Sequence, residues 1–522
     1  MEFREFNNFN AISFDIDNIS YIYDSYSNQL LKVSPVIVDI IDDTFVISRE
    51  KIIEKYKDKY SEDVISTAYK NVIDAQDKAN VFRKFTLPKL SLSSEKSTVE
   101  KVKEKLSESL SSLVLNVTED CNFRCEYCMY TGSYENRRSH NKLNDLSLDI
   151  AQKAVDFFVD NCKLAKFKNV GFYGGEALLR FEFIKKIVEY SQALDPSLKF
   201  SITTNGSLLN EKILEFLQEN KFKLNISLDG PEKLHDKFRK TVNHKPTYAL
   251  IMEKIELIKD KFPHLYSNDL SINSVLVPSQ GEEEYEELNR FFSEEPIFDF
   301  IKKDYEKLSF GAINPSTNSF FGKYNYSDFY KGFLRKMNQL FADFHINSLE
   351  VDRIIAPRVL NSRFIKLIHF RDNKRLPEYE FYWPNGICIP GMRSVFVSSD
   401  GTFYPCEKIY DYNLMPIGNV FDGLDYEKIA GYIDQYSEEA IRDCKNCWLF
   451  RLCGVCFTSY FGDDNSQLCE KSRKITCFSQ KYVVARYLKM YISIRSKNEH
   501  AFDYLVKEVS GKPQYVDAMI EN

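Results

Sequence analysis

Three closely spaced cysteines are the residues of this chain that are best suited to metal chemistry. Cys121, Cys125 and Cys128 follow the spacing CxxxCxxC. Thiolates at this spacing can hold three irons of a [4Fe–4S] cube, which leaves the fourth iron without a protein ligand. A cube closed by four cysteines mostly carries electrons, whereas an open iron can bind a substrate or a cofactor. Packing of the cysteines as small hydrophobic residues is the alternative, but it predicts no such spacing.

A second group of cysteines lies near the C-terminal end of the sequence. Four of them follow the spacing CxxCxxxxxCxxC, which could also form a zinc site. Eight cysteines are enough to close two cubes, or to leave one iron open and one cysteine spare. The remaining cysteine, Cys162, fits neither group and is predicted to be a core residue. The members of the second group are Cys388, Cys406, Cys444, Cys447, Cys453, Cys456, Cys469 and Cys477.

Composition narrows the class of protein. The chain has 522 residues, of which 43% are hydrophobic and 28% are charged, so we expect a globular protein of several domains. The net charge is −6 and no long basic run occurs, which disfavours a nucleic-acid partner. No apolar stretch reaches membrane-spanning length, and the N-terminal residues lack the pattern of a signal peptide. We therefore expect a reducing cytoplasm and cysteines that bind metal.

Polar and glycine-rich motifs follow the strands of a predicted βα alternation. Such alternation predicts a parallel sheet with outer helices, in the α/β class. The motifs after these strands, including the cysteine run, then meet at the carboxyl ends of the strands, where α/β barrels place their active sites. The predicted strands span residues 113–117, 169–173, 200–203, 224–228, 271–277 and 308–313.

The first 85 residues resemble a winged-helix pattern. A strand at 12–16 and a hairpin at 21–33 precede three short helices, which Ser34, Ser48 and Ser61 can cap. Winged helices often bind DNA, but no basic recognition helix is present here. Peptide binding at the edge of the sheet fits these residues better.

The cysteine run and the strand-end motifs together resemble those of the radical SAM family. The resemblance implies a partial (β/α)6 barrel in which S-adenosylmethionine (SAM) binds the open iron. The reduced cluster then cleaves SAM to methionine and a 5′-deoxyadenosyl radical, which removes a hydrogen atom from an unactivated C–H bond. A flavodoxin- or ferredoxin-type donor would supply the electron.

The same resemblance implies which residues contact SAM. Gly174, Gly175 and Glu176 match the family's GGE motif, where Glu176 would accept from the ammonium group. Arg239 would bind the methionine carboxylate. The other residues that match SAM-binding segments are Ser227, Thr204, Asn205 and Tyr127.

The C-terminal cysteines resemble a SPASM domain, which holds two auxiliary [4Fe–4S] clusters and would bring the total to three. The usual pattern closes with CxxxC, whereas here Cys453 and Cys456 are one residue closer. The resemblance implies that Cys388, Cys406 and Cys456 bind the first auxiliary cluster. It assigns Cys444, Cys447, Cys453 and one of Cys469 or Cys477 to the second.

Enzymes with SPASM domains mostly modify peptides, so we expect a peptide partner. The main hypothesis is a maturase that installs a thioether cross-link, from a Cys sulfur to a carbon, in a ribosomally made precursor whose leader binds residues 1–85. Alternatives are an anaerobic sulfatase-maturing enzyme that makes formylglycine, a C–C cross-linking enzyme, an epimerase, and a non-catalytic iron–sulfur redox sensor or electron carrier. Sulfatase-maturing enzymes carry an Asp acid/base directly after the GxxxxC cysteine. Glu407 stands there in this chain and is the candidate catalytic base.

These expectations divide the chain into six predicted segments. They are a winged-helix-like recognition domain (1–85), a linker (86–110), the barrel (111–320), bridging helices (321–385), the SPASM domain (386–480) and a C-terminal helix and tail (481–522).

Overall fold

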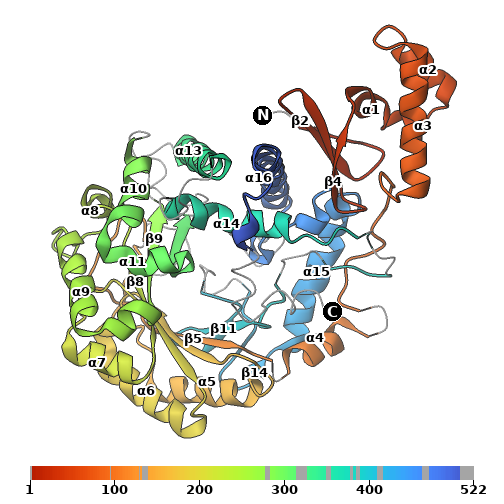
Figure 1. Cartoon of the computed structure of the whole chain (residues 1–522). Coiled ribbons are helices and arrows are strands. Elements are labelled where there is room, and N and C mark those ends of the chain that lie inside the picture. The colour runs from red at the N-terminus through yellow and green to blue at the C-terminus, as the bar shows by residue number, and fades with distance from the viewer. Residues whose placement is uncertain are drawn as a thin grey trace. The chain divides into compact units, whose positions relative to one another are not determined.

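The structure is a computed structural model of the whole chain (Figure 1). It describes residues 3–93, 96–107, 109–128, 130–131, 139–276, 283–312, 326–347, 354–374, 376, 380–383, 388–407, 415–460 and 469–505. The chain folds into two compact units. Unit 1 consists of Met1–Lys101, Arg363–Cys388 and Gly431–Asn522, and unit 2 consists of Val102–Ser362 and Ile389–Ala430.

Unit 2 is built on a parallel sheet of six strands that lie side by side in chain order, β5 to β10. This arrangement confirms the predicted sheet, although residues 277 and 313 at two of the predicted strand ends lie outside the described residues. Its strands are β5 (Ser112–Thr118), β6 (Asn169–Gly174), β7 (Lys199–Thr204), β8 (Lys223–Ser227), β9 (Leu270–Leu276) and β10 (Leu308–Ala312).

Helices follow the outer side of this sheet (Figure 1). Local sequence explains their limits: the Ser147 side chain accepts from the Ile150 N–H at the start of α5, and Asn210 caps α7 in the same way. Buried residues such as Ala154 and Phe158 on α5 recur at helical spacing and face the core. These helices are α5 (Leu148–Asn161), α6 (Phe181–Leu194), α7 (Glu211–Glu219), α8 (Glu232–Phe238), α9 (Tyr248–Lys261), α10 (Glu283–Glu294) and α11 (Asp299–Lys303). Two further helices, α13 (Tyr326–Ile346) and α14 (Ile355–His369), follow the sheet in the chain, and α14 continues into unit 1.

Four short strands extend the sheet beyond β5. Strand β11 (Ser394–Val397) pairs parallel to β5, and β12 (Thr402–Tyr404) returns antiparallel to β11. Strands β13 (Gly418–Asn419) and β14 (Gly423–Leu424) complete the antiparallel extension. The sequence analysis did not predict these strands.

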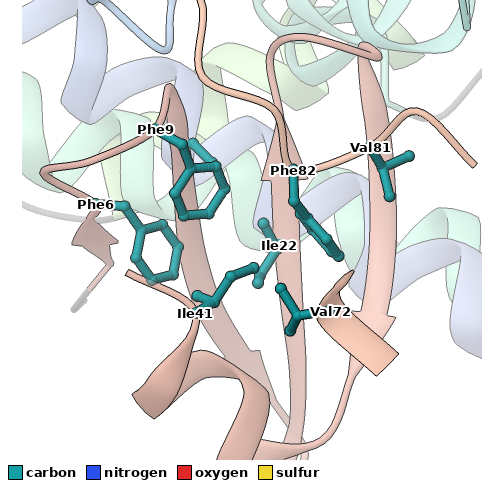
Figure 2. Packing of buried hydrophobic residues seen from close by; sticks show 8 residues of the cluster. Phe6, Phe9, Ile22, Ile41, Val72, Val81 and Phe82 are labelled. Atoms are coloured by element: carbon teal, nitrogen blue, oxygen red, sulfur yellow. The ribbon is translucent and has the colours of Figure 1, made fainter. Parts of the chain in front are cut away.

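In unit 1 the N-terminal residues form a four-stranded antiparallel sheet followed by three helices. The strands are β1 (Arg4–Glu5), β2 (Ala11–Ile16), β3 (Ile19–Asp24) and β4 (Gln29–Val33), and the helices are α1 (Pro35–Ile40), α2 (Arg49–Tyr56) and α3 (Glu62–Lys78). A core of aromatic and branched side chains joins the sheet to these helices (Figure 2). The predicted strand, hairpin and three helices are therefore confirmed, and β1 is an additional strand.

Beyond this N-terminal sheet and its helices, unit 1 contains further helices and loops, some of which pack against the sheet. Its helices include α4 (Thr98–Leu106), α15 (Tyr426–Cys444) and α16 (Glu470–Lys497), of which α4 and α15 continue into unit 2. The Trp448 ring lies 6.1 Å from the Tyr23 ring of β3, and the Leu87 N–H donates to the Lys445 carbonyl at 2.9 Å. Among the described residues, no helix is long and apolar enough to span a membrane.

Candidate active site

The three cysteines of the CxxxCxxC run lie in the loop that follows β5. The loop orients its own sulfurs, because the Phe123 N–H donates to the Cys121 Sγ at 3.3 Å and the Tyr130 N–H to the Cys128 Sγ at 3.5 Å. The Cys128 N–H donates to the Cys125 carbonyl at 3.0 Å, which keeps the second and third cysteines on one tight turn. Backbone donors to sulfur are a common feature of iron–sulfur sites.

The segment after α8 pairs with this cysteine loop. The Arg124 N–H donates to the Lys240 carbonyl at 2.7 Å, and the Glu126 N–H donates to the Phe238 carbonyl at 3.1 Å. These two bonds bracket Arg239, so the guanidinium predicted to bind the methionine carboxylate is held beside the cysteines.

The electrostatic environment of the three thiols suits a cationic metal centre. Burial raises the pKa of Cys121, and the neighbouring Glu176, Cys128 and Cys125 raise it further. Burial also raises the pKa of Cys125 to about 12, although Arg239 opposes this. Thiolates in such a place need a nearby positive charge, which iron would supply. Three soft sulfur donors on one loop therefore fit a [4Fe–4S] cube.

Among the described residues, no group of three or more His, Cys, Asp or Glu side chains closes on a single metal ion. A cube takes each thiolate on a different iron, so its ligands stand farther apart than ligands around one ion.

The Gly174-Gly175-Glu176 turn after β6 packs directly on the backbone of the cysteine loop. The Gly175 N–H donates to the Thr118 carbonyl and the Glu176 N–H to the Asp120 carbonyl, both at 2.8 Å. A Cβ on Gly174 would lie 2.3 Å from the Thr118 oxygen, and one on Gly175 would lie 2.2 Å from the Asp120 oxygen. Gly174 also has a φ of +140°. Only glycine fits this close approach.

Glu176 connects the end of β6 to the end of β7. Its carboxylate accepts hydrogen bonds from the Leu178 N–H at 3.0 Å, the Thr204 hydroxyl at 2.7 Å and the Asn205 N–H at 2.7 Å. Burial raises the pKa of Glu176, while these three donors oppose the shift. Two carboxylate oxygens offer about four acceptor positions, so three internal bonds leave capacity for a further donor.

Asn205 in turn contacts the cysteine loop. Its side-chain amide donates to the Asn122 Oδ1 at 2.8 Å and approaches the Cys121 Sγ at 3.9 Å. Its oxygen accepts from the Ser207 hydroxyl at 2.6 Å. The predicted residues Glu176, Thr204 and Asn205 are thus brought together with the first cysteine.

Asp229, to which sequence reasoning gave no role, joins two of the predicted SAM-binding residues. Its carboxylate accepts from the Tyr127 hydroxyl and, at 2.9 Å, from the Arg239 Nε, and its other oxygen accepts from the Val275 N–H at 2.9 Å. Burial alone would lower the pKa of Arg239, but Asp229 holds it above its usual value. The sequence could have indicated Asp229 as a functional residue, because it directly follows Ser227 and Leu228 at the end of a strand.

The two remaining predicted residues, Ser227 and Glu407, belong to different strand ends of the sheet. Ser227 is the half-buried last residue of β8, opposite Asn273 of β9. Glu407 follows β12, which runs antiparallel to β11, and β11 is parallel to β5. The chain therefore leaves β12 toward the amino end of β5, whereas the cysteine loop starts at its carboxyl end.

The C-terminal cysteines are divided between the two units. Cys406 belongs to unit 2, and the other seven belong to unit 1. Cys388 and Cys456 are exposed, and Cys469 directly precedes α16. The remaining four, Cys444, Cys447, Cys453 and Cys477, are electrostatic neighbours of one another. Burial raises the pKa of Cys447 to about 11 and that of Cys453 to about 12.

Comparison with known proteins agrees with this geometry. Residues 115–292 match the model of the radical SAM superfamily. A Cysteine-type anaerobic sulfatase-maturating enzyme of Clostridium novyi (strain NT) is 29% identical over 366 residues, which cover 66% of this chain and 87% of that protein. The corresponding enzyme of Clostridium perfringens (strain ATCC 13124) is 26% identical over 411 residues, which cover 76% of this chain and 97% of that protein.

A solved structure, native anSMEcpe with bound AdoMet, superposes with a TM-score of 0.54 at 22% identity. The match covers 77% of this chain and 100% of that one, and it confirms the predicted fold class. The cysteine loop and the strand-end residues that surround it all fall within residues 115–292. These residues form a radical SAM domain, and the chain is an enzyme that performs radical chemistry.

Proposed function

We propose that this enzyme oxidises a cysteine side chain of a peptide or protein substrate to formylglycine. The observation that carries the proposal is the near-complete match to two Cysteine-type anaerobic sulfatase-maturating enzymes, which extends over 87% and 97% of their lengths. This reaction was the alternative to thioether formation in the sequence analysis, and the similar enzymes favour it.

The residues of the site would divide the work as follows. A [4Fe–4S] cube and SAM, when bound, supply a 5′-deoxyadenosyl radical that removes a hydrogen atom from the substrate. Cys121, Cys125 and Cys128 would hold the cube. Arg239, oriented by Asp229, would bind the methionine carboxylate, and Glu176 would accept from the ammonium group with its remaining acceptor capacity. The other predicted SAM contacts, Tyr127, Gly174, Gly175, Thr204, Asn205 and Ser227, would line the same site.

The overall conversion exchanges a thiol for an aldehyde. Water supplies the oxygen, sulfur leaves as hydrogen sulfide, and the side chain gives up one hydrogen atom to the radical, one further electron and one proton. Glu407 is the proposed acceptor of the thiol proton. Auxiliary clusters on the C-terminal cysteines and a flavodoxin- or ferredoxin-type partner would carry the electrons.

A mass-spectrometric assay tests this function. Reduced, anaerobically reconstituted enzyme is incubated with SAM and a short sulfatase peptide that contains the target cysteine. We expect an aldehyde that reacts with a hydrazide, together with 5′-deoxyadenosine. The same peptide with Ala in place of Cys is the substrate control, and Cys125→Ala, which should cleave no SAM, is the enzyme control. A product that keeps its sulfur would contradict formylglycine formation.

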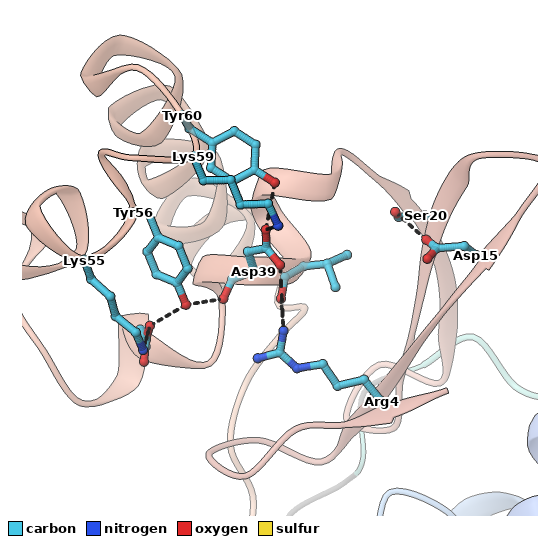
Figure 3. Close-up of polar contacts among 10 residues, drawn as sticks. Arg4, Asp15, Ser20, Asp39, Lys55, Tyr56, Lys59 and Tyr60 are labelled. Atoms are coloured by element: carbon cyan, nitrogen blue, oxygen red, sulfur yellow. Dashed lines mark hydrogen bonds and ion pairs between the residues drawn. The ribbon is translucent and has the colours of Figure 1, made fainter. Parts of the chain in front are cut away.

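A second candidate is the thioether-forming maturase of a ribosomal precursor peptide. The N-terminal sheet favours it, because β4 is an edge strand that could pair with a leader peptide. The helices beside it are firmly held: the Asp39 carboxylate accepts from Lys59 at 2.6 Å and from Tyr60 at 2.7 Å, and the Tyr56 hydroxyl donates to the Asp39 carbonyl at 2.8 Å (Figure 3).

Leader dependence separates the two candidates. A cysteine-containing precursor is offered with and without its leader, and the product is weighed. A thioether makes the peptide lighter by two hydrogens and keeps the sulfur, and we expect it only when the leader is attached. An unchanged mass with inverted stereochemistry would indicate an epimerase instead.

A further inference from the structure

Helix α16 presents one row of residues to the end of α15. Arg473, Cys477 and Lys481 are four residues apart and therefore share a face of the helix. The Arg473 Nε lies 2.9 Å from an oxygen of Asp443, directly before Cys444, and its Nη1 lies 3.3 Å from Glu439. These two ion pairs fix the register between α15 and α16 and place Cys477 beside the end of α15.

Tyrosines complete the link between the two helices. The Tyr460 hydroxyl lies 3.2 Å from the Cys477 Sγ, and its ring meets the Tyr436 ring of α15 edge-on with centroids 5.0 Å apart. The Tyr436 side chain is fully buried. Its electrostatic neighbours are Cys444, Cys453 and Cys477. Buried tyrosine hydroxyls beside several thiols can donate hydrogen bonds to the acceptor sulfurs of an iron–sulfur cluster.

Cys469 occupies a different place. It precedes α16, and its N–H donates to the Tyr460 carbonyl at 2.9 Å. Eight residues of helix separate it from Cys477, about 12 Å along the axis, with Arg473 between them. The two thiols therefore cannot serve the same ligand position.

We propose that Cys477, and not Cys469, completes a four-thiolate cluster site with Cys444, Cys447 and Cys453, and that the Tyr460 hydroxyl donates a hydrogen bond to the Cys477 sulfur. Four thiolates close all four irons of a cube, so this cluster carries electrons and binds no substrate. Hydrogen bonds to ligand sulfurs and nearby cations favour the reduced cluster. Tyr460, Arg473 and Lys481 supply them here, which makes Tyr460 a positioning residue that raises the reduction potential.

Iron content tests the ligand assignment without any measurement of activity. The full-length chain with Cys121, Cys125 and Cys128 all replaced by Ala keeps only the C-terminal cysteines for iron. In that background, Cys477→Ala should lose about four irons per chain, and adding Cys444→Ala should cause no further loss. Full iron in Cys477→Ala, or additive losses in the Cys444/Cys477 double variant, would overturn the assignment. Cys469→Ala is the matched comparison, and its loss, if any, should add to that of Cys444→Ala.

A redox titration provides a second test that does not depend on losing a ligand. Tyr460→Phe in the same background should keep its iron and shift one cluster signal in electron paramagnetic resonance to a more negative potential. Tyr482→Phe, which removes a hydroxyl from an exposed residue of α16, should leave all potentials unchanged. Unchanged potentials in Tyr460→Phe would refute the proposed hydrogen bond. Neither test depends on which substrate the enzyme oxidises.

Discussion

At the scale of single residues, the candidate site is held by side chains that bind one another from different strand ends. Glu176 joins two strand ends, and Asp229 joins Tyr127 to Arg239. Both carboxylates are almost fully buried. A buried charge requires a partner, so the removal of one member should affect the others.

Asp229→Asn should destabilise the protein and weaken SAM binding. The change leaves the Arg239 guanidinium in a buried position without its counter-charge, which typically costs about 3–5 kcal/mol. Chemical denaturation and calorimetric titration with SAM would measure the two effects. Asp269→Asn is the matched control, because Asp269 pairs with the exposed Lys223 at 2.6 Å and should lose less than about 1 kcal/mol. Equal losses in both variants would contradict the buried network.

Gly175→Ala should damage the cysteine loop. The added methyl group would lie 2.2 Å from the Asp120 carbonyl oxygen, so the backbone before Cys121 must move. We expect a loss of about four irons per chain and of SAM cleavage, measured by iron analysis and chromatography. Gly431→Ala is the control, because nothing lies within 4 Å of a Cβ there. That change lies inside α15 and should stabilise it by up to about 1 kcal/mol.

His235 should make the protein less stable below neutral pH. Burial lowers its pKa to about 4, while an unfolded histidine titrates near 6.5. The unfolded state therefore binds the proton first, and stability present above pH 6.5 is lost as the pH falls toward 4. A shift of this size corresponds to a few kcal/mol. Denaturation curves between pH 7 and 4 would measure this loss, and His235→Gln should flatten it in part, since His345 contributes in the same direction.

At the scale of elements, the N-terminal helices depend on a narrow buried stripe. On α3 the fully buried Ile65 lies next to Val64, which is 45% exposed. Ile65→Ala should destabilise the N-terminal segment by about 2–5 kcal/mol, whereas Val64→Ala should change stability by less than about 0.5 kcal/mol. Hydrogen exchange of the α3 amides would report both. Similar exchange rates in the two variants would contradict this packing.

How much of these elements the sequence predicts depends on the range of the interactions that form them. The parallel strands carry runs of apolar residues, and Ser34, Ser48 and Ser61 mark helix starts, so local pattern was sufficient. Strands β11 to β14 have two to four residues each and carry too little pattern to be recognised. Helix α16 extends from Glu470 to Lys497 and so begins well before residue 481, where the predicted C-terminal helix and tail start, because its first turns are ordered by Arg473 and its partners on α15.

The candidate active site shows the same contrast between residues that local sequence predicts and residues that depend on long-range contacts. Spacing singled out the cysteines and the glycine turn, but the partner of Arg239 is ten residues away on another segment. That Asp229 is this partner depends on how two loops pack together, and no local sequence pattern predicts such packing. The choice between Cys469 and Cys477 likewise depended on the register of two helices.

At the scale of the whole molecule, the chain's two ends share one compact unit. Trp448, which is 2% exposed, packs against Tyr23 and Phe3, and Lys481 pairs with Glu5 at 2.7 Å. The predicted domain boundaries stay predictions, but the N-terminal segment is not an isolated appendage. We therefore expect removal of the N-terminal segment to weaken iron binding by the cysteines nearest to Trp448 in the sequence.

Deletion of residues 1–80 should therefore affect SAM cleavage and iron binding by the C-terminal cysteines differently. SAM cleavage should persist, because the cysteine loop lies in unit 2. Iron bound to the C-terminal cysteines should fall by about four per chain, because Trp448, beside Cys447, loses its cover. Iron analysis and SAM cleavage would measure both, and Trp448→Phe should show a smaller loss in the same direction. Full iron after the deletion would contradict this coupling.

The shared unit also has a consequence for biosynthesis. The residues that cover Tyr23 are translated only after the entire six-stranded sheet has been made. At about 5–20 residues per second, roughly 20–90 s separate the synthesis of Tyr23 from that of Trp448. During this time the N-terminal sheet has its own core but a bare aromatic face. A nascent chain that stalls before residue 448 would therefore leave the aromatic face of the N-terminal sheet exposed to chaperones.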